Sequence, residues 1–355
     1  MTDGIESLIE SWDGLGVLTR YDRPTETWIF IALHDDTLGQ PCGGCRMKSY
    51  SDPRAALRDA MRLAEGMTYK WAGIGMLAGG GKSVLAVSRD LRGDERRGLF
   101  ERFGELLDSL NGTYSTGMDL GTTPEDMLAI GSRSRWVHGV NSADGTTVDP
   151  GPFTALGVFE SIVTTANRLG SGVDGLSVLV QGAGDVGRPL AGMLQQAGAN
   201  VRVSDLNERR AREVGDELNV EVIQPHVVPA VSCDVFSPCA VGAVLSEQTI
   251  PQLKCRAVVG SANNQLETLD DADRLHDRGI LWAPDYVANA GGAMAFGMIG
   301  AGESQDVARE KVKTLGSMLE QIYNEAAMRD ESPVHSARRR VHRILEEARK
   351  KKAPK

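Results

Sequence analysis

The second half of the chain alternates short apolar runs with segments whose apolar residues recur at helical spacing. Residues 176–181 form a run rich in β-branched side chains, typical of a buried strand, and residues 189–197 follow a helical period. The same pattern predicts further strands at residues 201–204, 233–236, 257–260 and 281–283. Because strands and helices alternate, the pattern predicts an α/β fold with a doubly wound parallel sheet.

The first half has a different pattern. Residues 28–33 are an apolar strand candidate, and Asp52 followed by Pro53 predicts a helix start, with aspartate as N-cap and proline at the first helical position. An apolar stripe typical of core packing follows at Leu57, Ala60, Met61, Ala64 and Met67. We expect Lys70 just beyond this helix, and a strand at residues 83–87.

The length of the chain predicts two domains, because 355 residues exceed the size at which a single core keeps growing. Two prolines and a glycine interrupt both patterns at residues 148–152, which predicts the hinge between domains 1–148 and 149–305. From about residue 306 the pattern predicts two helices, at 307–328 and 334–348.

The composition excludes several classes of partner. A formal net charge of −9 argues against general affinity for nucleic acid or for an anionic membrane. No run approaches the ~18 apolar residues of a membrane span, and the N-terminus lacks the features of a signal peptide. Five thinly spread cysteines fit a reducing compartment better than a disulfide framework, so we expect a cytoplasmic protein.

Cys42 and Cys45 form a C-x-x-C motif, which is found in redox pairs and in halves of metal sites. No second C-x-x-C follows, and two glycines lie between these cysteines. We therefore favour a packing role over redox or metal chemistry. The six histidines are isolated, with no H-E-x-x-H motif, so the sequence predicts no metal site.

Residues 182–187 read Gly-Ala-Gly-Asp-Val-Gly and lie between a predicted strand and a predicted helix. Such a turn brings backbone amides and the positive end of a helix to a pyrophosphate. Asp205 ends the next strand about 20 residues later, where an acid binds the adenosine ribose, and this favours NAD over NADP. Arg209 and Arg210 follow closely and keep NADP as an alternative. A glycine turn that only packs is the other interpretation.

Polar segments that begin at Ser237, Ser261 and Asp285 follow three of the later predicted strands. Ligands in open α/β sheets bind at the carboxyl ends of the strands, so these segments are candidates for ligand contacts. Asn264 and Asn289 could equally be turn residues, since asparagine favours turns for conformational reasons.

Lys70 and Lys82 are the strongest candidates for chemistry. The run Gly79-Gly80-Gly81-Lys82-Ser83 predicts a turn that presents Lys82, and two nearby ammonium groups would repel, so that one loses its proton more readily and becomes a base. Surface lysines are the plainer interpretation. The G-K-S ending also suggests a P-loop, but that motif requires a glycine where Met76 stands. A P-loop-like nucleotide-binding protein is therefore only a minor alternative.

These segments together resemble the glutamate, leucine, phenylalanine and valine dehydrogenases, most closely the branch that acts on apolar amino acids. The motifs that carry the resemblance span nearly the whole chain: residues 39–46, 67–70, 79–83, 116–119, 154–158, 182–187 and 289–292. The resemblance implies a substrate domain first, a Rossmann-type NAD domain second, a cleft between them, and C-terminal helices (306–355) that rejoin the first domain. It also implies a homo-oligomer, either a dimer or an octamer.

Matched residue by residue, the resemblance implies roles in oxidative deamination. Lys70 would bind the substrate carboxylate with help from the Gly43 backbone and the Asn263 amide. Lys82 would polarise a water and the developing carbonyl, while Asp119 exchanges protons with the amino nitrogen. The residues implied to bind NAD are Thr154, Gly182, Gly184, Asp185, Val186, Gly187, Asp205, Cys239, Ala240 and Asn289.

The substrate implied is an apolar L-amino acid, converted reversibly to the 2-oxo acid and ammonia. None of the positions that match the side-chain pocket is charged, which disfavours glutamate: Cys42, Met67, Gly117, Ala293 and Phe296. Small Gly117 and Ala293 favour phenylalanine or another aromatic over leucine and valine. The chain departs from the family at Cys45, where threonine is usual, and at residues 293–300. A non-catalytic NAD sensor of the same fold is the alternative, although Lys82 and Asp119 are both retained.

Overall fold

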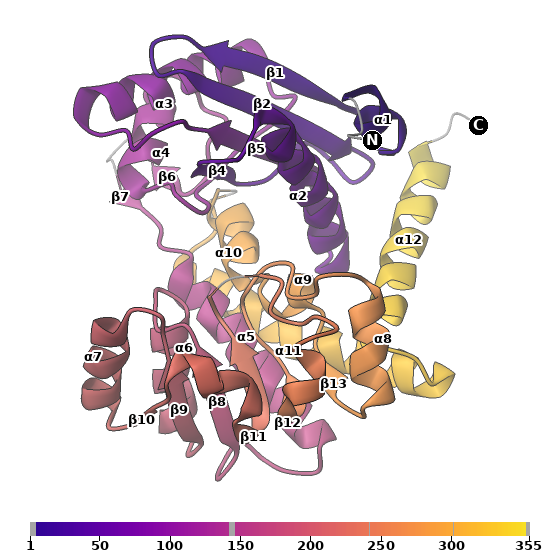
Figure 1. Ribbon diagram of the computed structural model, residues 1–355. Helices are drawn as coiled ribbons and strands as arrows, with labels where there is room; N and C mark the ends of the chain where they lie inside the picture. Colours follow the sequence, from indigo (N-terminus) through magenta and orange to yellow (C-terminus); the bar gives the residue numbers. More distant parts are fainter. Residues whose placement is uncertain (1–4, 142–145, 241, 301, 353–355) are drawn as a thin grey trace. The chain divides into compact units, whose positions relative to one another are not determined.

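The computed structural model describes residues 5–141, 146–240, 242–300 and 302–352. The chain divides into two compact units: unit 1 comprises Met1–Val148 with Val341–Lys355, and unit 2 comprises Asp149–Arg340. The chain therefore leaves unit 1 once and returns to it near its C-terminal end (Figure 1). Each unit is α/β, and each is described by itself.

Unit 1 is built on a mixed five-stranded sheet in the order β1-β2-β5-β3, with β4 also paired to β5. The first three strands are antiparallel, whereas β3 and β4 run parallel to β5. Its elements are α1 (Ile5–Glu10), β1 (Gly16–Asp22), β2 (Thr27–Asp35), β3 (Pro41–Cys42), β4 (Cys45–Lys48), α2 (Pro53–Gly73), β5 (Gly79–Ala86), α3 (Gly93–Ser109), α4 (Pro124–Gly131), β6 (Val140–Asn141) and β7 (Thr146–Thr147).

Helix α2 begins where the sequence predicts. The Asp52 side chain accepts hydrogen bonds from the amides of Arg54 (2.7 Å) and Ala55 (3.0 Å), and Pro53 occupies the first turn. The helix continues to Gly73, however, so the prediction that Lys70 lies beyond it is wrong. Lys70 belongs to the last turn of α2, because the apolar stripe extends past Met67 to the buried Trp71.

The glycine run before Lys82 is part of strand β5, and the predicted turn is wrong. A Cβ atom added to Gly80 would lie 1.8 Å from Thr68 Oγ1, and one added to Gly79 would lie 2.2 Å from the Asp35 carbonyl oxygen. The glycines are therefore needed because α2 and β2 pack directly on the backbone of β5. Lys82 consequently projects from a strand in the middle of the sheet. An extended, closely packed run cannot form a phosphate-cradling P-loop.

Unit 2 is built on a fully parallel six-stranded sheet in the order β10-β9-β8-β11-β12-β13. This is the strand order of doubly wound dinucleotide-binding domains. Its elements are α5 (Gly151–Arg168), β8 (Ser177–Gln181), α6 (Gly187–Gln196), β9 (Asn200–Ser204), α7 (Glu208–Leu218), β10 (Glu221–Val222), the 3-10 turn η1 (Pro225–Ala230), β11 (Ser232–Pro238), η2 (Ile250–Gln252), β12 (Lys254–Val258), α8 (Asp270–Asp277), β13 (Leu281–Trp282), α9 (Asp285–Ala288), α10 (Gly291–Gly300), α11 (Gln305–Arg329) and α12 (Pro333–Lys352), which ends in unit 1.

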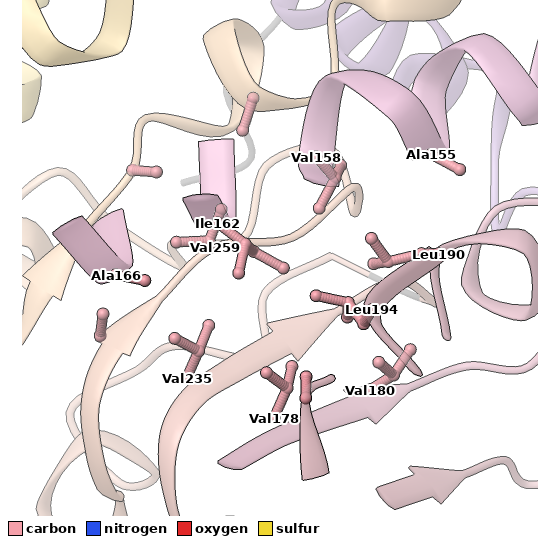
Figure 2. Packing of buried hydrophobic residues seen from close by; sticks show 14 of the residues in the cluster. Ala155, Val158, Ile162, Ala166, Val178, Val180, Leu190, Leu194, Val235 and Val259 are labelled. Carbon is pink, nitrogen blue, oxygen red and sulfur yellow. The ribbon is translucent and has the colours of Figure 1, made fainter. Parts of the chain in front are cut away.

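Helices α5 and α6 cover the parallel sheet and fix the position of the glycine turn that joins β8 to α6. Figure 2 shows their apolar side chains facing those of β8, β11 and the segment after β12. The labelled members of this core are Ala155, Val158, Ile162, Ala166, Val178, Val180, Leu190, Leu194, Val235 and Val259. All of them are fully buried, so the turn is held at the end of a rigid layer.

The C-terminal helices differ from the prediction that residues 306–355 rejoin the first domain. Helix α11 belongs to unit 2, because its side chains at Leu319, Ile322 and Tyr323 are buried in the same core as α5. Only the end of α12, from Val341, belongs to unit 1. Within the described ranges, no helix combines the length and the apolar character needed to cross a membrane.

Candidate active site

Lys82 and Asp119 form a buried ion pair in unit 1. Lys82 Nζ lies 3.1 Å from Asp119 Oδ1, and the two side chains are 6% and 16% exposed. Asp119 lies in the loop before α4, where its amide donates a hydrogen bond of 2.9 Å to Thr122 Oγ1. The structure thus brings together the two residues predicted to be catalytic, although they lie far apart in the sequence.

Arg46 binds the other oxygen of Asp119. Its Nε lies 3.0 Å from Asp119 Oδ2, and its Nη1 lies 3.2 Å from Asp59 Oδ2. Asp59 in turn accepts a hydrogen bond of 2.7 Å from the Tyr50 hydroxyl. Our sequence analysis missed this support. Asp59 lies outside the apolar stripe of α2, so the hydrophobic pattern gave no signal of this contact.

Two cations control the charge state of Asp119. Burial alone would raise its pKa, but attraction to Lys82 and Arg46 lowers the pKa to about 2. The carboxylate is therefore ionised at neutral pH. In the structure the negative charge of Asp119 lies against Lys82, and the repulsion between Lys82 and Lys70 stays a prediction.

Met67 and Lys70 share one face of α2, since they are three residues apart. A Cβ atom added to Gly43 would lie 3.0 Å from Met67 Cγ, so the loop between β3 and β4 packs against this face. The Gly43 backbone, predicted to help bind a carboxylate, is used within unit 1: its amide donates to the Ser115 carbonyl (3.2 Å), and its carbonyl accepts from Tyr114. Gly43 is required because a Cβ would lie 1.9 Å from the Gly81 carbonyl oxygen.

The thiols of the C-x-x-C motif are free and protonated. Burial raises the pKa of Cys42 to about 11 and that of Cys45 to about 12. Both residues lie on strands beside β5, which agrees with a packing role. Among the residues that the structure describes, no three His, Cys, Asp or Glu side chains are grouped to hold a metal ion.

The glycine turn of unit 2 has the geometry that a dinucleotide requires. Gly182 has φ of +104°, and a Cβ on it would lie 2.9 Å from Ala240 Cβ. A Cβ on Gly187 would lie 1.7 Å from the Gly182 carbonyl oxygen, so the start of α6 packs directly on the turn. A Cβ on Gly184 would have only the Arg210 side chain within 4 Å, with Nη1 at 4.0 Å, which leaves the Gly184 backbone accessible. Glycine is therefore needed at 182 and 187 so that the turn can pack tightly, and at 184 so that its backbone stays accessible to a ligand.

Other predicted cofactor residues cluster at the same edge of the sheet. The Cys239 amide donates to the Gln181 carbonyl (2.7 Å), which holds the 239–240 segment against the turn. Asp205 accepts a hydrogen bond of 2.8 Å from the Ala183 amide. Thr154 lies at the start of α5, where its hydroxyl donates to the Pro150 carbonyl oxygen (2.9 Å).

Asn289 and Asn263 are in direct contact. Asn289 Nδ2 donates to Asn263 Oδ1 (2.7 Å) and to the Ser261 carbonyl oxygen (3.1 Å). Its Oδ1 atom is buried and accepts no hydrogen bond from the described residues. A buried acceptor without a donor is costly, and a ligand amide would satisfy it. This atom and the exposed glycine turn fit a dinucleotide with a carboxamide head group, such as a nicotinamide coenzyme.

The remaining predicted pocket residues are divided between the units. Gly117 is buried in unit 1, where its carbonyl oxygen accepts from the Cys45 amide (2.8 Å). Ala293 and Phe296 are half-buried on α10 of unit 2. Asn264 has φ of +53° and its carbonyl oxygen accepts from the Ala243 amide, so it serves as a turn residue.

Comparison with known proteins places both units in one family. The family model described as Glu/Leu/Phe/Val dehydrogenase, dimerisation domain, matches residues 26–135, and that of glutamate/leucine/phenylalanine/valine dehydrogenase matches residues 203–350. Leucine dehydrogenase from Geobacillus stearothermophilus is 37% identical over 349 residues, which cover 98% of this chain and 94% of the relative. Phenylalanine dehydrogenase from Lysinibacillus sphaericus is 37% identical over 325 residues, which cover 89% of this chain and 84% of the relative.

A solved structure supports the same assignment. The crystal structure of L-tryptophan dehydrogenase from Nostoc punctiforme matches with a TM-score of 0.81 and 33% identity, covering 98% of this chain and 100% of that one. The relatives thus match nearly the full length of the sequence, and the family models agree with them over residues 26–135 and 203–350. The chain therefore belongs to the glutamate/leucine/phenylalanine/valine dehydrogenase family and is an amino-acid dehydrogenase.

Proposed function

We propose that this enzyme catalyses the reversible oxidative deamination of an apolar L-amino acid to the 2-oxo acid and ammonia, with NAD as hydride acceptor. The observation that carries the proposal is the buried pair of Lys82 and Asp119. Oxidation at the α-carbon requires a neutral amine before the hydride leaves, and it requires a cation for the developing carbonyl oxygen. A carboxylate and an ammonium group held together provide both functions.

Each residue has one role in this reaction. Lys70 pairs with the substrate carboxylate, and Asp119 accepts the proton that the substrate ammonium group must lose. Bound NAD supplies the acceptor for the hydride from the α-carbon, which leaves an iminium ion. Lys82 orients the water that adds to the iminium carbon and stabilises the oxygen as it becomes a carbonyl. The water loses one proton to solvent as it adds, which gives a neutral carbinolamine. Asp119 returns its proton to the nitrogen, the C–N bond breaks as ammonia leaves, and the hydroxyl proton passes to solvent as the carbonyl forms, so the enzyme is restored.

The proposed substrate is phenylalanine or another aromatic amino acid, followed by leucine and valine. No position proposed to contact its side chain is charged: Cys42, Met67, Gly117, Ala293 and Phe296. Gly117 and Ala293 are small and would leave room for a large ring. The relatives named for phenylalanine and tryptophan support this preference, whereas the leucine dehydrogenases support the next choice.

The proposed coenzyme is NAD, bound by unit 2. The turn of residues 182–187 and the 239–240 segment would hold the pyrophosphate, and Asp205 would take the ribose hydroxyls. Asn289 Oδ1 would accept a hydrogen bond from the nicotinamide carboxamide. Asn263 contacts Asn289 and is proposed to bind the substrate carboxylate. The two contacting asparagines would therefore bind the substrate and the coenzyme respectively.

We further propose a cytoplasmic homo-oligomer. The name of the family model that matches residues 26–135 supports oligomerisation through unit 1. The five cysteines are all free thiols, which supports a reducing compartment.

The test is an absorbance assay at the NADH band with a panel of L-amino acids, using NAD and NADP separately. Lys82→Ala should abolish turnover and leave NADH binding nearly intact, while the control Lys313→Ala, on the exposed surface of α11, should behave as wild type. A Lys82→Ala enzyme with most of its activity would refute the assignment. NADH binding without turnover of any amino acid would instead favour a sensor.

A further inference from the structure

Two arginines follow strand β9, and the structure separates their roles. Arg209 is 85% exposed and pairs with Glu213 on the outer face of α7, at 3.5 Å. Arg210 is half exposed, and its Nη1 lies 3.5 Å from Asp205 Oδ2. The same Nη1 atom lies 4.0 Å from the point where a Cβ on Gly184 would stand. Only Arg210 therefore faces the glycine turn of unit 2.

Arg210 is not needed to hold Asp205 in place. Asp205 Oδ2 accepts from the Ala183 amide and Oδ1 accepts from the Asn207 amide, both at 2.8 Å, and the side chain is 10% exposed. The distance of 3.5 Å to Arg210 exceeds the usual range of an N–H···O hydrogen bond. Because the Arg210 side chain is half exposed and the distance is long, this ion pair contributes little free energy, so the guanidinium can leave Asp205 at small cost.

We infer that Arg210 is the coenzyme-specificity residue of this enzyme, and that its guanidinium turns from Asp205 to the 2′-phosphate of NADP(H), so that the site binds NADP(H) as well as NAD(H). The inference rests on the proposed function, which places the adenosine ribose at Asp205. An aspartate here repels a 2′-phosphate, whereas a neighbouring arginine neutralises the aspartate and offers a planar pair of donors that matches phosphate oxygens.

The test is fluorescence titration of NADH and NADPH against the full-length protein, without substrate. The wild type should bind both coenzymes. Arg210→Ala should weaken NADPH binding by about 10-fold or more, the loss expected for one charged hydrogen bond, and should change NADH binding by less than about 3-fold. Arg209→Ala, the matched control one residue away, should leave the ratio of the two affinities unchanged. Arg210→Lys should recover part of the NADPH affinity, because it keeps the charge.

Four results would overturn the inference. Equal losses for NADH and NADPH in Arg210→Ala would place the arginine at the pyrophosphate, which both coenzymes share. Unchanged affinities for both coenzymes in Arg210→Ala, or a wild type that binds NADH but not NADPH, would remove Arg210 from specificity while leaving the proposed NAD-dependent function intact. Failure of the wild type to bind either coenzyme would overturn both this inference and the proposed coenzyme site.

Discussion

Asp119 has a different cation on each of its two oxygens. Lys82 holds Oδ1 and Arg46 holds Oδ2, while Arg46 is itself fixed by Asp59. A carboxylate bound on both sides cannot rotate freely, so the oxygen that receives the substrate proton keeps a fixed direction. The cost of burying four charges is offset because each has an opposite charge within hydrogen-bond distance. The catalytic geometry is thus a property of a network rather than of one residue.

Replacing Arg46 should expose this dependence. Arg46→Gln leaves Asp119 and Asp59 buried without their shared cation, and we expect a loss of about 3 to 5 kcal/mol in the free energy of unfolding, measured with urea.

The pH dependence of stability should change in Arg46→Gln as well. In the wild type the folded-state pKa of Asp119 is about 2, below its ordinary value of 3.8. Its stabilisation is therefore complete above pH 3.8 and disappears as the pH falls towards 2.

Without Arg46 the pKa of Asp119 should rise, so the remaining stabilisation should be smaller and should disappear at a higher pH. Arg62→Gln is the matched control, since Arg62 also pairs with Asp59 but from the exposed surface and without contact to Asp119. That change should cost less than about 1 kcal/mol. Equal costs for the two variants would show that Arg46 does not support Asp119.

At the scale of elements, the packing of α2 on β5 positions the candidate catalytic residues. Strand β5 carries Lys82, and α2 carries Lys70 on its last turn. The two elements approach closely because Gly80 has no side chain: its Cβ would lie 1.8 Å from Thr68 Oγ1 and 2.6 Å from the Ala64 carbonyl oxygen. The backbone carbonyl cannot move without breaking the helix. The helix and the strand can therefore lie this close only because residue 80 is a glycine.

Two glycine-to-alanine changes test this packing. Gly80→Ala should destabilise the protein by several kcal/mol and reduce activity, because α2 must shift away from β5. Gly66→Ala, within α2 itself, should stabilise by about 0.5 to 1 kcal/mol, since a Cβ there meets no atom within 4 Å and alanine is the better helix former. Thermal and urea unfolding measure both. A Gly80→Ala protein as stable as the wild type would contradict the close packing.

Local chemistry explains which elements the sequence could predict. Asp52 and Pro53 define the start of α2, and the glycines of residues 182–187 define the β8–α6 turn, because caps and tight turns depend on neighbouring residues. The glycines of β5 were misinterpreted because the atoms that require them, on Thr68 and Asp35, are distant in sequence. Arg46 was missed for the same reason, since its partners lie on α2 and in a later loop.

At the scale of the whole molecule, unit 1 is not one continuous segment of the chain, because residues from both ends of the sequence belong to it. Helices α11 and α12 are both amphipathic, and an apolar face alone does not show which unit a helix packs against. The structure assigns α11 to unit 2 by the burial of Leu319 and Tyr323 against α5. Helix α12 begins in unit 2 and ends in unit 1, so one continuous helix carries the chain back. Unit 1 is therefore incomplete until the last residues have been added.

The final turns of α12 should consequently determine the stability of unit 1. Val341 is fully buried against Ala72 of α2, and Arg349 binds Asp35 at 2.7 Å. Val341→Asp places a charge in this apolar contact, and we expect a loss of several kcal/mol. Arg343→Asp introduces the same residue on the exposed face of the helix and should cost less than about 1 kcal/mol.

Calorimetry can distinguish the two units in these variants. Because Val341 belongs to unit 1, its replacement should lower the unfolding temperature of that unit and abolish turnover, while NADH binding by unit 2 persists at lower temperature. Simultaneous loss of NADH binding and of unit 1 would mean that the units unfold as one cooperative body. Equal effects of Val341→Asp and Arg343→Asp would remove the end of α12 from the core of unit 1, since only burial separates the two positions.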